Sequence, residues 1–129
     1  MRLLLDSHVA VAVIHRELLR YGRSIHRVLL SDETERVVSA ASLWEMAIKN
    51  RVGKLELQIP LAEIPDYLIS TGIELLDINH RHALAELHTV PSTRDPFDRM
   101  LLAQCQVEGL QLVTVDRALI AHPLAWRAP

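Results

Sequence analysis

The chain has 129 residues, half of them apolar, which is enough for one compact domain with a sizeable core. Its formal net charge is −2, so it lacks the overall basic character of many nucleic-acid-binding proteins, and any such binding must use a local patch or a bound cation. The apolar runs are much shorter than the ~20 residues of a membrane-spanning helix, and the first residues, MRLLLDSHVAVAVI, lack the cleavage site of a signal peptide.

Short apolar strands alternate with helical segments along the chain. We expect strands at residues 2–5, 36–40, 73–78 and 110–115. We expect helices from Ser7 onward and over residues 24–32, 43–50, 60–70, 81–87 and 96–108. The alternation indicates right-handed βαβ units in an α/β fold, with a central, mostly parallel sheet that helices cover on both faces.

The cysteine and histidine content argues against a disulfide scaffold or a histidine metal site. The single Cys105 excludes an internal disulfide, fits the reducing cytoplasm and is interpreted as a core residue of its apolar helix. The seven histidines are scattered, and we interpret them as surface or partly buried residues. The one close pair, His80 and His82, has a spacing that suits a helical metal site poorly. We therefore expect one cytoplasmic domain, residues 1–129, without membrane association.

Four acidic residues stand at the junctions between these strands and helices. Asp6 directly follows the first strand and Asp116 the last, while Glu45 and Asp98 lie in the first turns of their expected helices. The carboxyl ends of parallel strands meet at one edge of a sheet, where sites of α/β proteins form. Acids that are far apart in the sequence are thus expected to converge on one pocket.

Each of these acids also has a purely structural interpretation. Asp6 and Asp116 fit helix N-caps, Ser42 with Glu45 fits a capping box, and Glu45 with Lys49 fits an i,i+4 surface pair. Glu45, however, has apolar neighbours on both sides, and a carboxylate among buried residues needs a partner. A divalent metal ion would satisfy several carboxylates at once.

The stretch DPFD contains two aspartates with different expected roles. Asp95 fits the N-cap of the helix, and Pro96 fits its first position. Because Asp95 supplies the cap, Asp98 at the third position is free to act as a ligand. We expect Asp95 to be structural, or at most to support the ligands from behind.

Four segments resemble, in this order, the PIN-domain family, and within it the VapC-like toxins of bacterial toxin–antitoxin pairs. They are LLLDSH (3–8), SAASLWEMAIKNRVGKLEL (39–57), DPFDRMLLAQC (95–105) and LVTVDRAL (112–119). The resemblance runs nearly end to end. It implies a PIN-like three-layer α/β/α fold and a metal-dependent endoribonuclease.

The resemblance also implies site residues, a metal and partners. The family's acidic positions map onto Asp6, Glu45, Asp98 and Asp116. Ser7 takes the hydroxyl position after the first acid, and Thr114 is a supporting donor before the last. The implied cofactor is Mg²⁺, with Mn²⁺ as a substitute and either one or two ions. The implied partners are RNA, a cognate antitoxin whose basic or apolar tail covers the acidic pocket, and a second copy of the chain in a homodimer.

RNA must be held locally, because the chain is not basic overall. The candidate phosphate contacts are basic residues near the acids, although each is also interpretable as solvated charge: Lys49, Arg51, Lys54, Arg94 and Arg99.

Other proteins with similar sheets fit the sequence less well. A receiver needs paired acids after the first strand and a haloacid dehalogenase needs D-x-D there, whereas Ser7 and His8 follow Asp6. Two alternatives stay open: a non-catalytic PIN-fold interaction module, and a DNA-cleaving nuclease with the same acidic site.

Overall fold

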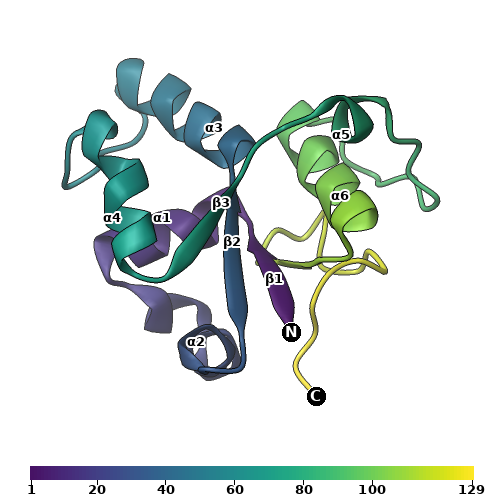
Figure 1. Cartoon of the computed structure of the whole chain (residues 1–129), viewed down its shortest axis with the longest axis horizontal. Coiled ribbons are helices and arrows are strands. Elements are labelled where there is room, and N and C mark those ends of the chain that lie inside the picture. Colours follow the sequence, from purple (N-terminus) through teal and green to yellow (C-terminus); the bar gives the residue numbers. More distant parts are fainter.

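The centre of the protein is a four-stranded parallel sheet of order β3-β2-β1-β4, seen in a computed structural model that describes residues 1–129 (Figure 1). Its strands are β1 Arg2–Leu5, β2 Glu35–Ser39, β3 Ile73–Leu76 and β4 Gln111–Val113. Leu4 of β1 pairs with Val37 on one side and Leu112 on the other. The expected parallel sheet is confirmed, with the last two strands shorter than the sequence indicates.

The helices follow the alternation expected from the sequence. They are α1 Ser7–His15, α2 Arg23–Leu30, α3 Ala40–Arg51, α4 Ile64–Ser70, α5 His80–Leu84 and α6 Pro96–Glu108, with short 3-10 turns η1 Leu18–Tyr21 and η2 Leu61–Glu63. The sequence pattern does not indicate η1. None of the helices is both long and apolar enough to cross a membrane.

Helix α3 begins earlier than the sequence predicts. Its N-cap is Ser39, whose hydroxyl accepts a hydrogen bond from the Ala41 amide. The capping box between Ser42 and Glu45 is therefore wrong: Ser42 is buried inside the helix, and Glu45 lies in the second turn rather than the first.

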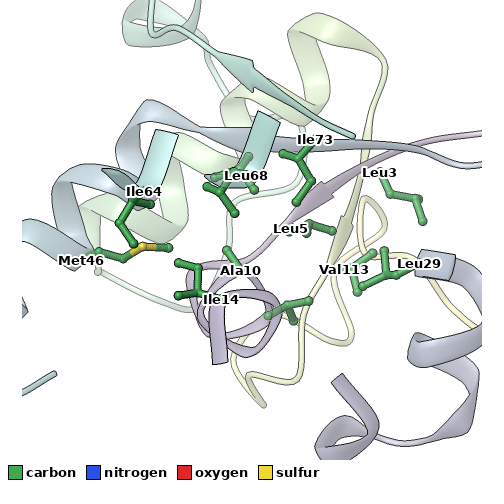
Figure 2. Packing of buried hydrophobic residues seen from close by; sticks show 12 residues of the cluster. Leu3, Leu5, Ala10, Ile14, Leu29, Met46, Ile64, Leu68, Ile73 and Val113 are labelled. Carbon is green, nitrogen blue, oxygen red and sulfur yellow. The ribbon is translucent and has the colours of Figure 1, made fainter. Parts of the chain in front are cut away.

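The sheet lies between two apolar layers, as the three-layer α/β/α expectation requires. Neighbouring residues of a strand point to opposite faces, so Leu3 and Leu5 join one core cluster and Leu4 joins the other. Helices α1, α2 and α4 cover the first face, and α6 covers the second (Figure 1). Figure 2 shows the first cluster packed between the sheet and its helices. Cys105 is buried in the second cluster, which fits its interpretation as a core residue, and burial raises its thiol pKa to about 12.

A segment near the end of the chain covers the outer edge of β4. The Leu112 amide donates to the Leu124 carbonyl, and the Trp126 amide donates to the Leu112 carbonyl, each at 2.8 Å. Ala125 thereby forms an isolated parallel bridge with Leu112. The backbone groups of β4 are paired on both sides.

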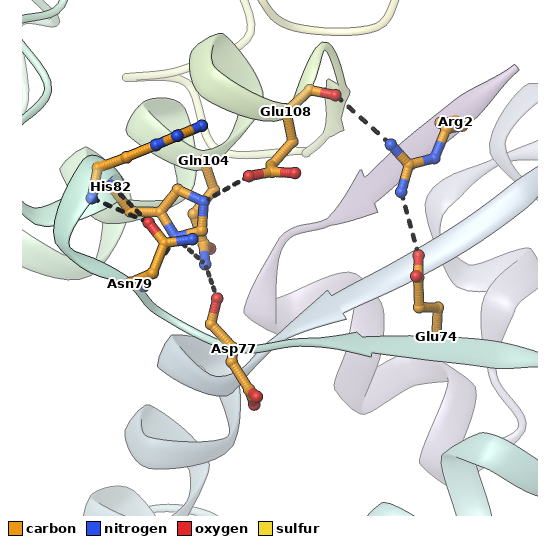
Figure 3. Close-up of polar contacts among 8 residues, drawn as sticks. Arg2, Glu74, Asp77, Asn79, His82, Gln104 and Glu108 are labelled. Carbon is orange, nitrogen blue, oxygen red and sulfur yellow. Dashed lines mark hydrogen bonds and ion pairs between the residues drawn. The ribbon is translucent and has the colours of Figure 1, made fainter.

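A buried histidine holds α5 against α6 (Figure 3). The Nδ1 of His82 accepts from the Asn79 amide at 3.1 Å, so the ring proton is on Nε2, which lies 2.9 Å from Glu108 Oε2. The Asn79 side chain caps α5, and Gln104 donates to the Asp77 carbonyl. His82 is therefore a core residue, and His122 is also buried, so the interpretation of the histidines as surface or partly buried residues is wrong for these two.

Candidate active site

The sheet brings the four candidate acids to the carboxyl ends of its strands. Asp6 follows β1 directly, Asp98 lies in the first turn of α6, and Asp116 follows β4 after two residues. Glu45 reaches the same region from α3, which continues directly from β2 (Figure 1). The charge of Glu45 raises the pKa of Asp6, and the charges of Asp6 and Asp116 raise the pKa of Asp98, so the four carboxylates form one electrostatic group.

Asp6 is the most deeply buried of the four, with only 3% of its surface exposed. Its Oδ1 accepts from the Ser7 amide at 2.7 Å, which makes it the N-cap of α1, and its Oδ2 accepts from the Thr114 hydroxyl at 2.6 Å. Burial raises the pKa of Asp6 above its ordinary value, while the hydrogen bonds from Thr114 and Ser7 act to lower it. Asp6 is thus both a helix cap and a candidate ligand.

Glu45 is already paired within the protein. Its Oε1 accepts from the Ser7 hydroxyl at 2.7 Å, and its Oε2 lies 2.8 Å from the ammonium of Lys49. The Ser7 hydroxyl oxygen also lies 3.0 Å from that of Ser42. The i,i+4 pair is therefore formed, on a glutamate whose side chain is only 12% exposed. Glu45 differs from the other acids because it has its own counter-charge.

Asp98 is held by the loop before α6. Asp95 is the N-cap of this helix and accepts from the Phe97 amide at 2.8 Å. The Thr93 hydroxyl donates to Asp98 Oδ2 at 3.1 Å and accepts from the Asp95 amide. Burial, and next the charge of Asp95, raise the pKa of Asp98 to about 6; the charges of Asp6 and Asp116 add to this.

Asp116 is connected to Asp6 through one threonine. Its amide donates to the Thr114 hydroxyl oxygen at 3.0 Å, and the same hydroxyl donates to Asp6. The Asp116 Oδ1 accepts from the Ala118 amide. Thr114 therefore orients two of the acids.

Two residues of this site are not indicated by the sequence analysis. Ser42 contacts Ser7 from inside α3, whereas its local sequence indicates only a capping box with Glu45. Thr93 stands two residues before the Asp95–Pro96 cap, a spacing at which a hydroxyl accepts from a nearby amide, and this signal could have found it.

The candidate RNA contacts lie at four separate places on the protein. Lys49 and Lys54 line a hollow that also contains Ser7 and Glu45. Arg51 lines a different hollow beside α4, and Arg99 lines one between α5 and α6. Arg94 is exposed in the loop before α6.

Residues 3–123 match the sequence profile of the PIN domain. The chain belongs to the PIN-domain family. This membership supports a nuclease, that is, a hydrolase that acts on nucleic acids, and it agrees with the resemblance carried by the four sequence segments.

Solved structures share the architecture of this PIN domain at low sequence identity. One is a chain of VapBC2 from Rickettsia felis bound to a DNA fragment from its promoter, with a TM-score of 0.65, 18% identity, and coverage of 97% of this chain and 96% of that one. Another is a chain of a toxin–antitoxin complex from Klebsiella pneumoniae, with a TM-score of 0.58, 15% identity, and coverage of 96% and 95%. No curated protein matches the chain at a significant level.

The donor chemistry of this PIN domain fits a hard divalent cation. PIN nucleases generally use divalent metal ions, and the site supplies carboxylate oxygens, which such ions prefer. No group of three or more acidic, histidine or cysteine side chains converges closely enough to cage an ion. A hard cation that keeps several of its waters needs only one or two carboxylates, so the residues of the site fit such an ion without enclosing it.

Proposed function

We propose that this PIN domain is a Mg²⁺-dependent endoribonuclease that acts as the toxin of a type II toxin–antitoxin pair. The observation that carries the proposal is the pair Asp6 and Asp98. Both carboxylates are buried, both have raised pKa values, and neither forms an ion pair with a lysine or arginine. The charge of His8 acts to lower the pKa of Asp6 but does not offset its burial, and no positive group acts on Asp98. Buried carboxylates that are not neutralised destabilise a fold, so this pair favours a cation as the missing partner.

The protein's own residues orient this pair. Thr114 and the Ser7 amide hold the two oxygens of Asp6, and Thr93 holds one oxygen of Asp98. The second oxygen of Asp98 has no hydrogen-bond partner within the protein and is free for a ligand. A bound Mg²⁺, or Mn²⁺ in its place, would lower the pKa of a water molecule and stabilise negative charge on the scissile phosphate.

Glu45 and Asp116 complete the proposed acidic set in less direct roles. Glu45 keeps the Ser7 hydroxyl turned toward the site and is itself neutralised by Lys49. Asp116 adds negative charge beside Asp98 and fixes the Thr114 hydroxyl through its amide. Asp116 thus increases the attraction of the site for a cation, and neither acid is needed as a direct ligand.

A cognate antitoxin is the proposed protein partner. The support is the fold shared, over nearly the whole chain, with chains of VapBC2 and of a toxin–antitoxin complex. A basic or apolar antitoxin tail would offset the negative charge of the acidic pocket. A homodimer belongs to the same proposal through the family resemblance.

Cleavage assays test the catalytic part of the proposal. The purified protein, free of inhibitor, should cut single-stranded RNA in Mg²⁺ or Mn²⁺ and not in EDTA, and it should leave DNA of the same sequence intact. Robust cleavage in excess EDTA would exclude the metal mechanism. Cleavage of DNA in preference to RNA would instead assign a DNA nuclease, and no cleavage of either would favour the non-catalytic interaction module.

Expression in a bacterial host tests the toxin part. The wild-type chain should arrest growth and reduce cellular RNA integrity, and Asp98→Asn expressed at the same level should do neither. Growth and RNA that remain unaffected by an active, well-expressed wild-type protein would contradict a toxin.

A further inference from the structure

A cavity lies beside Glu45, between α1, η1 and α3, and the other three acids do not line it. Its volume is about 270 Å³, and it shares Ser7 and Glu45 with the site. Its other walls come from α1, η1, α3 and the residues just after α3. Ligand pockets commonly measure about 300–1,000 Å³, so this cavity is near the size that suits one small ligand group rather than a folded structure.

The cavity is basic, although the chain as a whole is not. It gathers five side chains that are cationic or able to become so around a single acid, Glu45, in a protein of formal net charge −2. They are His8, His15, Arg20, Lys49 and Lys54. Positive charge that is concentrated beside an acidic centre is suited to bind a phosphate next to a metal-assisted reaction.

Two of these cations are available for a ligand. Lys54 is exposed and forms no ion pair, and Arg20 has only a long, exposed contact with Glu17 at 3.7 Å. Lys49, in contrast, is occupied by Glu45 at 2.8 Å. Lys54 and Arg20 are therefore the first candidates for direct phosphate contacts.

An aromatic ring lies beside the available cations. Tyr21 lines the cavity, and the guanidinium of Arg20 lies 5.8 Å from the centre of its ring. Aromatic side chains and arginine planes are the surfaces on which single-stranded RNA bases stack. The His15 Nε2 lies 2.9 Å from the Glu56 carbonyl, so this nitrogen carries a proton and its ring is fixed in the wall.

We propose that this cavity is a nucleotide subsite that binds the RNA residue next to the scissile phosphate, with its phosphate on Lys54 and Arg20 and its base or ribose against Tyr21. The inference rests on the proposed ribonuclease function and adds the direction in which the strand leaves the acids, toward α1 and η1. The cationic side chains of the cavity would repel a basic antitoxin tail and attract the negatively charged phosphates of RNA. The charge of the cavity therefore favours RNA as the occupant.

Kinetics and binding of single-stranded RNA test the subsite. Lys54→Gln and Arg20→Gln should each raise KM, and the Kd of a cleavage-resistant phosphorothioate RNA in Mg²⁺, by about fivefold, with kcat within about twofold of wild type. The slope of log Kd against log salt should become shallower by about 0.7 for each lost phosphate contact. Arg81→Gln on α5 is the matched control, because Arg81 is exposed and lines none of the hollows around the site. Its KM, Kd and salt slope should be unchanged.

Several outcomes would overturn the subsite. Lys54→Gln and Arg20→Gln proteins with unchanged KM and salt slope, in an enzyme that cleaves RNA, would reject the subsite while keeping the ribonuclease. A larger loss of RNA affinity in Arg51→Gln, Arg94→Gln or Arg99→Gln would show that the RNA binds along another face of the protein. Unchanged RNA binding combined with weakened antitoxin binding would assign the cavity to the protein partner. A wild-type protein that neither binds nor cleaves RNA would remove the proposed function and the subsite together.

Discussion

Helix α6 carries a polar cluster at each end, and the two clusters are electrostatically different. At its carboxyl end, Glu108 accepts a hydrogen bond from the buried ring of His82, so a donor faces an acceptor. At its amino end, Asp98 lies among other carboxylates, and no cation of the protein pairs with it. The first cluster is satisfied within the protein, and the second is not.

This difference separates groups that stabilise the fold from groups that we propose to bind a ligand. A buried donor and acceptor that satisfy each other fix two helices in place at little electrostatic cost. Buried like charges raise one another's pKa and destabilise the fold until a counter-charge arrives. Predictions for the two ends of α6 should therefore have opposite signs for stability and for activity.

The largest expected effect is the loss of cleavage in Asp98→Asn. Loss of residues that only support metal ligands typically costs about 10–100-fold, so loss of a proposed ligand should lower cleavage by more than about 100-fold. Without metal, the variant should be as stable as wild type or more stable at pH 7. The difference between a folded pKa of about 6 and the ordinary 3.8 corresponds to a penalty of at most roughly 3 kcal/mol for the ionised carboxylate.

The pH dependence of this stability difference checks its origin. The penalty is fully present above pH 6 and disappears as the pH falls toward 3.8, because the folded protein takes up the proton first. Thermal unfolding of both proteins in EDTA at several pH values, beside an RNA cleavage assay, measures both effects. A destabilised but active Asp98→Asn protein would instead indicate a simple charge at a helix N-terminus, worth about 0.3–1 kcal/mol.

At the other end of α6, His82→Ala should destabilise the protein and spare its chemistry. The change leaves a cavity and removes the partners of Glu108 and the Asn79 amide, so we expect a loss of about 2–4 kcal/mol in the free energy of unfolding. Cleavage per folded molecule should be unchanged. His80→Ala is the control, since His80 is exposed on the same helix and should shift stability by less than about 0.5 kcal/mol. Equal effects of the two variants on stability would contradict the structural role of His82.

Binding of Mg²⁺ should weaken in acid. A proton competes with the cation for Asp98 once the pH falls below about 6, so the apparent affinity should fall by up to about tenfold per pH unit in that range. Calorimetric titration with Mg²⁺ between pH 5 and pH 8 measures this dependence. A flat profile across pH 6 would mean that Asp98 does not bind the ion.

The smallest expected effect is that of Lys49→Gln. The variant removes the counter-charge of Glu45, so Mg²⁺ affinity should rise by about two- to fivefold, while stability changes by no more than about 1 kcal/mol because the Lys49 side chain is 42% exposed. RNA binding should weaken, because Lys49 also lines the proposed nucleotide subsite. Lys54→Gln provides the comparison, since it should weaken RNA binding without raising metal affinity. A lower Mg²⁺ affinity in Lys49→Gln would contradict the expectation that Lys49 weakens metal binding by neutralising Glu45.

Helix α6 shows which features the sequence is able to predict. Asp95 and Pro96 are strong local start signals and Gly109 is a stop signal, so the helix has the predicted bounds, Pro96–Glu108. The parallel sheet follows in the same way from short apolar runs between helices. Local chemistry and periodicity were sufficient for both.

Helix α3 and the basic cavity show where local signals are insufficient. Ser39 ends a β-branched strand and caps α3 at once, and no polar linker separates the two elements. The cavity needs Arg20 from η1 and Lys54 from beyond α3 to meet beside Ser7, a convergence that depends on tertiary packing. From the sequence, Lys49 could be the i,i+4 partner of Glu45 or a contact for an RNA phosphate. The distance of 2.8 Å between the two side chains favours the first interpretation.

The segment that pairs with β4 has a consequence for handling the protein in solution. Leu124 and Trp126 occupy the outer backbone groups of Leu112, which would otherwise form an open strand edge. Open edges are templates for pairing between molecules and lead to aggregation. A truncation before Leu124 would thus expose the outer edge of β4 and leave the acidic site unchanged. A loss of solubility in such a variant would arise from pairing of these strand edges between molecules and not from altered chemistry.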